Sequence, residues 1–226
     1  MRISIIKYWL LLLPLWPLGA QTDSSARAEK RPVPRPWSLR VGYDTGKKIW
    51  ASANGGQIDQ AYLWLGYGNH LVEITGGRES MPYRHTTYGL QATGYYIKVG
   101  YHYNFYENWG DMRNEITWGI RYAQSRFGYD LQYLDIRYPG PEGSVYYWQG
   151  HRYSPPVTAR WLETVVTVKA ELKWHIYLDL FVAGKWIPRI PQAGYMEAVY
   201  IPGFYETNVS HFGFGLGYGV SYRFGY

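Results

Sequence analysis

The residues that could do chemistry in this sequence are charged side chains, set one at a time into alternating apolar segments. Around Lys98, for example, apolar residues occupy positions 97, 99 and 101, with polar or small residues between them. Successive side chains of an extended strand point to opposite faces, so each such segment has one apolar face and one polar face. The polar faces carry five basic and five acidic residues, which are Arg40, Lys98, Arg121, Lys169 and Arg223 with Asp44, Glu73, Glu163, Glu171 and Asp179.

These ten charges are predicted to form ion pairs in a narrow interior. An unpaired buried charge costs several kcal/mol or becomes neutral, so charges enclosed together must balance. The equal numbers of the two signs indicate a closed salt-bridge plug. A gated pore or a proton path is the alternative interpretation of the same residues.

Other reactive residues form weaker patterns. His102 and His211 fall on polar faces, where a hydrogen-bonded structural histidine is the ordinary role, and no histidine spacing indicates a zinc site. Ser154, His151 and Glu142 could form a hydrolase trio, but a long polar segment offers such a trio by chance. The sequence has no cysteine, which excludes disulfides, cysteine-ligated zinc and a cysteine nucleophile. We expect no cofactor and no metal.

The segments that position these residues are eight predicted strands. Their strongest example is 211–226, where every second residue is large and apolar and most residues between are glycine. A wall with hydrocarbon outside and a narrow polar lumen inside has this contrast. The predicted strands are 38–50, 58–67, 70–78, 92–105, 114–127, 158–172, 176–187 and 211–226.

The connections between these strands alternate in length. Those after the second, fourth and sixth strands are short, and those after the third, fifth and seventh are long. The predicted fold is therefore all-β, an eight-stranded antiparallel up-and-down transmembrane barrel of the outer-membrane type. A ten-stranded barrel with a further hairpin inside 128–157, a secreted lipocalin-like barrel and an ordinary aromatic-rich β core are the alternatives.

Aromatic residues near the strand ends are expected to form two girdles at the membrane interfaces. The proportion of aromatic residues is 19%, well above their usual share. The residues assigned to the girdles are Tyr43, Trp50, Tyr67, Tyr106, Trp109, Trp161, Trp174 and Trp186.

The start of the chain resembles a secretory signal. Arg2 and Lys7 precede an apolar run at 8–18 that is too short to span a bilayer, and Ala20 suits cleavage. We predict a signal peptide at 1–20, a flexible periplasmic leader at 21–36 and the barrel at 37–226, with an uncleaved anchor as the alternative. The net charge of +6 is scattered without a basic stripe, so no nucleic-acid partner is expected.

Three segments carry a resemblance to a known family. They are the segment from Tyr96 to Trp109 (YIKVGYHYNFYENW), the segment 161–171, which begins with Trp161, Leu162 and Glu163, and the segment 200–204. They resemble an uncharacterised domain-of-unknown-function family of predicted outer-membrane barrels from Gram-negative bacteria. The resemblance covers most of 37–226 and implies the fold, but it implies no activity. It also implies a C-terminal insertion signal for the outer-membrane insertion machinery, at Val220, Tyr222, Phe224 and Tyr226.

Together these patterns predict a non-enzymatic integral outer-membrane protein. The segments 128–157 and 188–209 are expected to contact the exterior, a partner or lipopolysaccharide, and the wall to contact the lipid bilayer. An outer-membrane lipid-modifying enzyme and a narrow gated pore remain as the alternatives.

Overall fold

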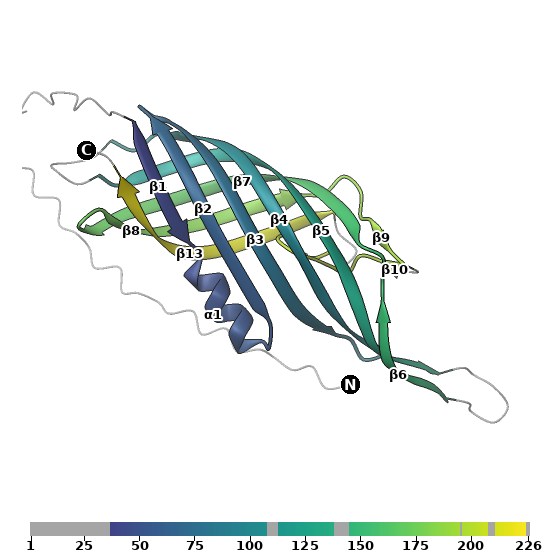
Figure 1. Cartoon of the computed structure of the whole chain (residues 1–226). Helices are drawn as coiled ribbons and strands as arrows, with labels where there is room; N and C mark the ends of the chain where they lie inside the picture. Colours follow the sequence, from purple (N-terminus) through teal and green to yellow (C-terminus); the bar gives the residue numbers. More distant parts are fainter. Residues whose placement is uncertain (1–36, 108–112, 138–144, 195, 208–210, 225–226) are drawn as a thin grey trace, which may run out of the picture. The chain divides into compact units, whose positions relative to one another are not determined.

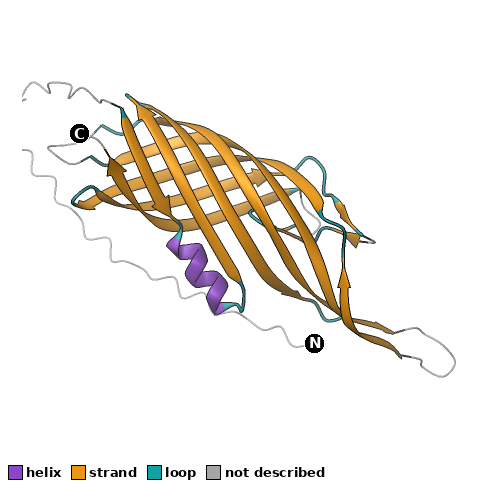
Figure 2. Ribbon diagram, viewed as in Figure 1, coloured by secondary structure: helices purple, strands orange, loops and turns teal. Residues whose placement is uncertain are grey.

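The computed structural model describes residues 37–107, 113–137, 145–194, 196–207 and 211–224. The predicted signal peptide and leader, and Tyr226, lie outside the described residues. Eight long strands form a closed antiparallel barrel, in which each strand pairs with its neighbour along the chain and β1 pairs with β13 (Figure 2). The strands of the wall are β1 (Ser38–Tyr43), β2 (Gln57–Tyr67), β3 (His70–Arg84), β4 (Tyr88–Asn104), β5 (Glu115–Arg137), β7 (Val157–Lys173), β8 (Ile176–Trp186) and β13 (Phe212–Phe224). The predicted all-β, eight-stranded fold is confirmed.

The alternation of the sequence decides which side chains enter the barrel. In β4 the buried Lys98, Gly100 and His102 alternate with the exposed Val99 and Tyr101. The same pattern runs along β7, where buried positions alternate with exposed ones that include Leu162, Val166 and Val168. A wall that is apolar outside and charged inside is the reverse of a soluble protein, because the hydrophobic effect normally buries the apolar face.

The barrel has two different ends, which we call the turn end and the loop end. The turn end carries the connections at 68–69, 105–114 and 174–175, together with Ser38 and Phe224. The loop end carries the helix α1, the connection at 85–87, the extension of β5 and the segment between β8 and β13 (Figure 1).

The first strand is shorter than predicted. β1 ends at Tyr43, and the helix α1 (Thr45–Ala53) takes up the residues expected to continue the strand. The Asp44 side chain accepts a hydrogen bond from the Lys47 backbone N–H and caps the helix. Asp44 is therefore buried, as expected, but as a helix cap at the loop end.

The strands at the loop end are longer than predicted. The expected loop at 79–91 is mostly strand, because β3 and β4 pair up to Arg84 and Gly89. β5 also extends to Arg137 and pairs with β6 (Val145–Tyr153), which confirms a hairpin inside 128–157. Because β6 pairs with β5 alone among the described strands, this hairpin adds no strand to the closed barrel.

The segment between β8 and β13 returns into the barrel mouth. Residues 198–207, which we call the plug segment, contain the short strands β11 (Tyr200–Ile201) and β12 (Tyr205–Glu206). Ile201 and Phe204 are buried with wall residues such as Leu90 and Trp161 in one apolar cluster. The segment 188–209 was expected to contact the exterior, but most of 198–204 is buried in the mouth, because its apolar side chains gain free energy from burial. β9 (Gln192–Ala193) and β10 (Met196–Glu197) precede the plug segment.

Among the described residues, no helix has the length and apolar character needed to cross a membrane.

Candidate functional site

The middle of the barrel interior is organised around Arg121. Its Nε lies 2.8 Å from Glu73 Oε2, and its Nη1 lies 3.5 Å from Glu163 Oε2. Lys98 Nζ donates to Glu163 Oε1 at 2.7 Å, and His102 Nε2 lies 2.9 Å from Glu73 Oε2. All five side chains are almost completely buried, so each charge depends on these partners in place of water.

A second cluster fills the turn end. Arg40 donates from both terminal nitrogens to the two carboxylate oxygens of Glu115, at 2.5 and 2.6 Å. Lys169 Nζ lies 3.6 Å from the same carboxylate and 3.2 Å from the centre of the Trp64 ring. A bidentate guanidinium–carboxylate pair combined with a cation–π contact is a strong way to hold charges inside a barrel. We call these residues together the polar cluster: Arg40, Glu73, Lys98, His102, Glu115, Arg121, Glu163 and Lys169.

Glycines on the inner face make room for this cluster. A Cβ atom on Gly119 would lie 2.4 Å from the His102 ring, and one on Gly100 would lie 2.6 Å from Cγ of Arg121. Either side chain would have to move if its glycine were replaced. The glycines of the polar faces therefore serve packing, and they do not leave an open lumen.

Two lysines connect the wall to the plug segment. Lys98 Nζ donates to the Gly203 carbonyl at 3.2 Å, and Lys185 Nζ donates to the carbonyls of Gly203 and Phe204 at 3.0 and 3.1 Å. On β3, the strand beside β4, the Glu79 carboxylate accepts from the Tyr200 hydroxyl and, at 2.8 Å, from the Gly203 N–H. The turn at Gly203 is therefore bonded on both sides, and the plug segment is held as part of the interior.

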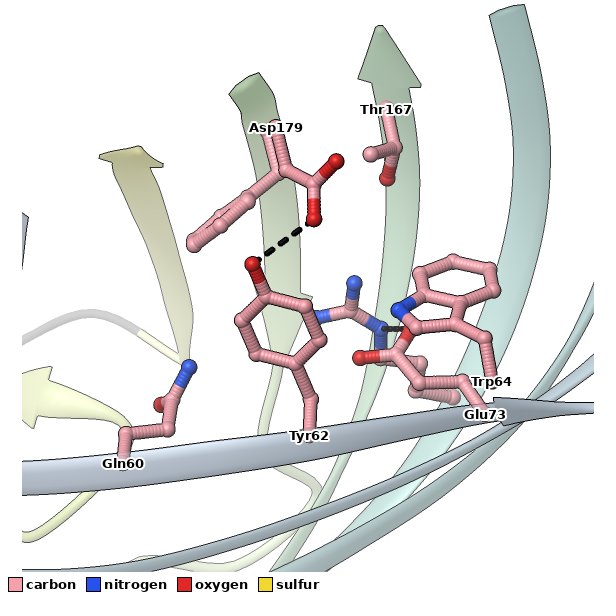
Figure 3. A pocket seen from close by; sticks show the side chains of 8 residues that line it. Gln60, Tyr62, Trp64, Glu73, Thr167 and Asp179 are labelled. Atoms are coloured by element: carbon pink, nitrogen blue, oxygen red, sulfur yellow. Dashed lines mark hydrogen bonds and ion pairs between the residues drawn. The ribbon is translucent and has the colours of Figure 1, made fainter. Parts of the chain in front are cut away.

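A small cavity lies inside the barrel beside Glu73 and Arg121 of the polar cluster. In Figure 3 the Tyr62 hydroxyl points across it and donates to Asp179 Oδ2, at 2.7 Å. The cavity has room for about one water molecule, far less than a substrate pocket requires. It is lined by Gln60, Tyr62, Trp64, Glu73, Arg121, Thr167, Asp179 and Phe181.

The predicted charges do not all meet. Arg121, Lys98, Glu73 and Glu163 come together, whereas Asp179 bonds the Tyr62 hydroxyl. Of the remaining predicted residues, Arg223 is buried near the turn end and Asp44 lies near Lys47 at the loop end.

Glu171 differs from the prediction. It is half-buried at the turn-end rim, where its carboxylate accepts from the Arg113 N–H at 3.1 Å. Its strand position has the predicted parity, but at a strand end this side chain is not enclosed.

Four interior charges were not predicted. Glu115 and Lys185 share strand parity with Arg121 and Asp179, so the alternation alone could have found them. Glu79 was assigned to a loop that is strand, and Lys47 to a strand that is helix.

Trp161 is a further correction. It was assigned to an aromatic girdle but is buried, and its indole N–H donates to Glu163 at 2.8 Å. It has the inward parity of Glu163, two residues along the same strand, and this parity was overlooked.

The described residues that were considered for catalysis or metal binding each contact a different partner and do not form one site. The Ser154 hydroxyl accepts from the Tyr129 N–H, His151 Nδ1 lies 2.8 Å from Asp130 Oδ2, and Glu142 lies outside the described residues. His102 belongs to the polar cluster, and His211 Nδ1 lies 2.7 Å from the Ile187 carbonyl. Within the part of the chain that is described, no three histidine, aspartate or glutamate side chains are grouped to hold a metal.

The proposed insertion signal lies on the outer face of β13. Val220, Tyr222 and Phe224 are exposed and alternate with the buried Ser221 and Arg223. Their recognition by insertion machinery stays a prediction.

The solved structures that are similar to this chain include two outer-membrane proteins of low sequence identity. One is Neisserial surface protein A, with 12% identity, coverage of 83% of this chain and 94% of that chain, and a TM-score of 0.44. The other is a major outer membrane protein from Thermus thermophilus, with 12% identity, coverage of 83% and 98%, and a TM-score of 0.49. No curated protein matches the chain significantly. A family model matches residues 1–225, and the chain therefore belongs to the family described as Domain of unknown function (DUF6048).

Proposed function

We propose that this protein is a closed, non-conducting barrel of the outer membrane that presents the β5–β6 hairpin outside the cell. The observation that carries this proposal is that the outer face of the wall is apolar and its inner face is charged. Exposed apolar residues such as Val99, Ile120 and Val182 cover its outer face, whereas buried ion pairs fill its inner face. An apolar surface of this extent suits hydrocarbon, and a β-wall can cross hydrocarbon when it is closed.

The topology supports an orientation for the barrel. Outer-membrane barrels have short turns on the periplasmic side and longer connections outside. The turn end then faces the periplasm, and the loop end, with α1 and the β5–β6 hairpin, faces the exterior. Lipopolysaccharide and the bilayer are the partners that this placement brings to the wall.

The filled interior argues against a pore and against an enzyme inside the barrel. The polar cluster occupies the turn-end half, and the plug segment occupies the mouth. The cavity beside the polar cluster is too small for a substrate. The function left for the barrel is binding or structural support, carried by its outer surface and by the hairpin.

The hairpin offers contacts suited to binding at its base. The Tyr83 and Tyr88 rings stack there with centroids 6.1 Å apart, and the Tyr133 hydroxyl donates to the His85 carbonyl. The His151 ring stacks beside the exposed Tyr153. Exposed or partly buried aromatic rings that their neighbours hold in place are common at binding surfaces.

The location is tested first by gel mobility of the outer-membrane fraction, boiled and unboiled. A compact detergent-resistant barrel should migrate faster before boiling. A protein found in the soluble periplasm without such a shift would contradict the proposal.

The orientation is tested with single-cysteine variants, for which the chain is suited because it has no cysteine. Tyr153→Cys should react with a membrane-impermeant maleimide on intact cells. Trp174→Cys, at an equally exposed residue of the turn end, should react only after the outer membrane is permeabilised. Labelling of Trp174→Cys alone on intact cells would reverse the orientation.

A further inference from the structure

The β1–β13 pairing that closes the barrel covers only the turn-end part of β13. β1 and β13 pair from Leu39–Phe224 to Tyr43–Val220, and there β1 gives way to α1. β13 continues for another eight residues, 212–219, where β8 is its one strand partner in the described part of the chain. One edge of β13 therefore faces α1 in place of a strand.

The backbone groups on this edge can be assigned from the hydrogen bonds of β13. His211 O accepts from the Ile187 N–H, and the Arg223 N–H donates to His175 O. The backbone N–H and C=O groups of the odd-numbered residues of this strand therefore point toward β8. Backbone N–H and C=O groups alternate sides along an antiparallel strand. Phe214 and Leu216 therefore direct their N–H and C=O groups toward the α1 side, where Tyr218 O accepts from the Thr45 hydroxyl at 3.4 Å.

Side-chain exposure marks the same boundary. The outward-facing Tyr218 and Val220 are 42% and 41% exposed, whereas Phe214 and Leu216 are 84% and 77% exposed. All four belong to one strand and have β8 on one side. The difference is the neighbour on the other side, which is present for Val220 and missing for Phe214.

The helix does not replace the missing strand. Gly46 of α1 lies against the Tyr218 ring, but Figure 1 shows α1 turning from there along the start of β2, away from the remainder of β13. Lys47 and Ala51 face the interior, and Ile49 and Trp50 remain exposed.

The interior side of the gap is occupied. The Trp50 ring lies 6.1 Å from the Tyr205 ring, and Tyr205 lies 4.1 Å from Lys185 Nζ. A Cβ atom on Gly215 would meet that Nζ at 3.3 Å, so these side chains reach from α1 to β13. These side chains fill the gap on its interior side, and the gap is open on the outer face of the barrel. We call it the lateral opening, with Phe214 and Leu216 on one rim and Ile49 and Trp50 on the other.

The lateral opening lies at the depth of hydrocarbon. Leu216 is eight residues from Phe224 at the turn end of β13, which places it about 20 Å above that end for a tilted strand rising about 3.3 Å per residue. Its partner on β8, Val182, is also exposed and apolar, so the opening is continuous with the outer apolar face. Unsatisfied backbone groups at this depth cost several kcal/mol each.

A second barrel is a poor partner for this edge. Two barrels inserted in the same direction would bring their β13 strands together in parallel, whereas each of the described wall pairs is antiparallel. Parallel pairing is slightly weaker per residue. The remaining occupant at this depth is a membrane lipid.

We propose that the lateral opening binds an acyl lipid whose hydroxyl or amide groups bond the open edge of β13. The edge N–H groups need acceptors, which any ester carbonyl supplies, but the edge C=O groups need donors. A hydroxyacyl or amide-linked glycolipid supplies both, and a glycerophospholipid supplies no donor among its acyl esters. The acyl chain lies against Phe214 and Leu216. This site rests on the membrane location proposed above.

The experiment places the photo-crosslinker p-benzoyl-phenylalanine at position 214 of the full chain. The matched control has it at position 182, which is apolar, outward-facing and beside β13 but between two strands. Both proteins are reconstituted in phosphatidylcholine vesicles that contain a minority of hydroxyacyl glycolipid. At position 214 the glycolipid adducts should exceed the glycolipid's share of the vesicle several-fold, whereas at position 182 they should match that share.

Three outcomes would overturn this site. Adducts at position 214 that match the lipid composition would mean bulk lipid only. A crosslink from position 214 to residues 45–53 would mean that α1 closes the seam, and a crosslink to a second barrel would mean an oligomer. Failure of both proteins to insert in vesicles would instead count against the membrane proposal.

A proline substitution tests the hydrogen-bonding edge itself. Leu216→Pro removes an N–H that faces the opening, and proline is tolerated on a strand edge. We expect this variant to keep the fast-migrating unboiled form and to lose the glycolipid enrichment at position 214. Val182→Pro removes an N–H inside the wall and should lose the fast-migrating form. Retained enrichment in Leu216→Pro, or loss of its barrel form, would overturn the assignment of the edge.

Discussion

The two halves of the barrel interior are filled in different ways. Toward the turn end, the polar cluster is built from side chains of the wall strands alone, such as Arg40, Glu115 and Arg121. Toward the loop end, a segment distant in sequence returns into the mouth and buries Ile201 and Phe204 among wall side chains. One half is therefore closed by charge pairing across the barrel and the other by apolar burial of the chain itself.

The difference predicts how each half tolerates change. A buried ion pair gives little net stability when complete, but the loss of one partner leaves an uncompensated charge. An apolar cluster loses stability in proportion to the atoms removed and the cavity left behind. The polar half should therefore lose stability when a charge is neutralised without a change in side-chain size. The apolar half should lose stability when a buried side chain is shortened.

The largest effect is expected for Glu163→Gln. This carboxylate accepts from Lys98 and from the Trp161 indole and pairs with Arg121, so its neutralisation leaves two buried cations with less compensation. We expect a loss of about 3–5 kcal/mol in the free energy of unfolding, measured by urea denaturation in detergent micelles. Glu171→Gln, the same change at the rim, should cost less than about 1 kcal/mol. Equal losses in the two variants would contradict a closed polar half.

The next effect is expected for Phe204→Ala in the plug segment. Phe204 is almost fully buried, and its ring packs edge-on against Trp161 at 5.7 Å. Removing a buried phenylalanine ring lowers the free energy of unfolding by about 3–5 kcal/mol in a soluble core. The lower value is expected here if the plug segment moves into the space that the ring leaves. Glu206→Ala, at an exposed residue of the same segment, is the control. A Phe204 variant as stable as this control, in the same urea titration, would mean that the segment is not packed in the mouth.

A smaller effect is expected for Tyr62→Phe at the boundary between the halves. The substitution keeps the ring and removes the hydroxyl that donates to Asp179. The loss of a hydrogen bond to a buried carboxylate should cost about 1.5–3 kcal/mol. An unchanged urea midpoint would indicate that water in the adjoining cavity takes over the bond.

The wall and the polar cluster were largely predictable from the sequence. Alternation assigns a face to each strand residue, so Lys98, Arg121 and Glu163 are placed inside by parity alone. The partner that each charge selects was not predictable, because pairing across the lumen depends on strand register and tilt. Arg40 illustrates this, since it bonds Glu115, a residue 75 positions away in sequence.

The loop end was predicted less well, for physical reasons that differ by element. α1 has only nine residues, and its main sequence signal is the cap at Asp44. The plug segment has an apolar run at Tyr200–Ile201, but its burial depends on contacts with distant strands. The open edge of β13 follows from the early end of β1, so it could not be inferred before α1 was seen.

The most direct test of a closed interior is ion conductance in planar lipid bilayers. The wild-type barrel should show no conductance steps, because the polar cluster and the plug segment both fill the lumen. Replacement of residues 200–205 by a glycine–serine linker should leave the barrel closed, since the polar half remains, and combining it with Arg121→Ala should open steps. Regular conductance steps from the wild-type protein would show that the interior is not filled in the membrane and would contradict the account.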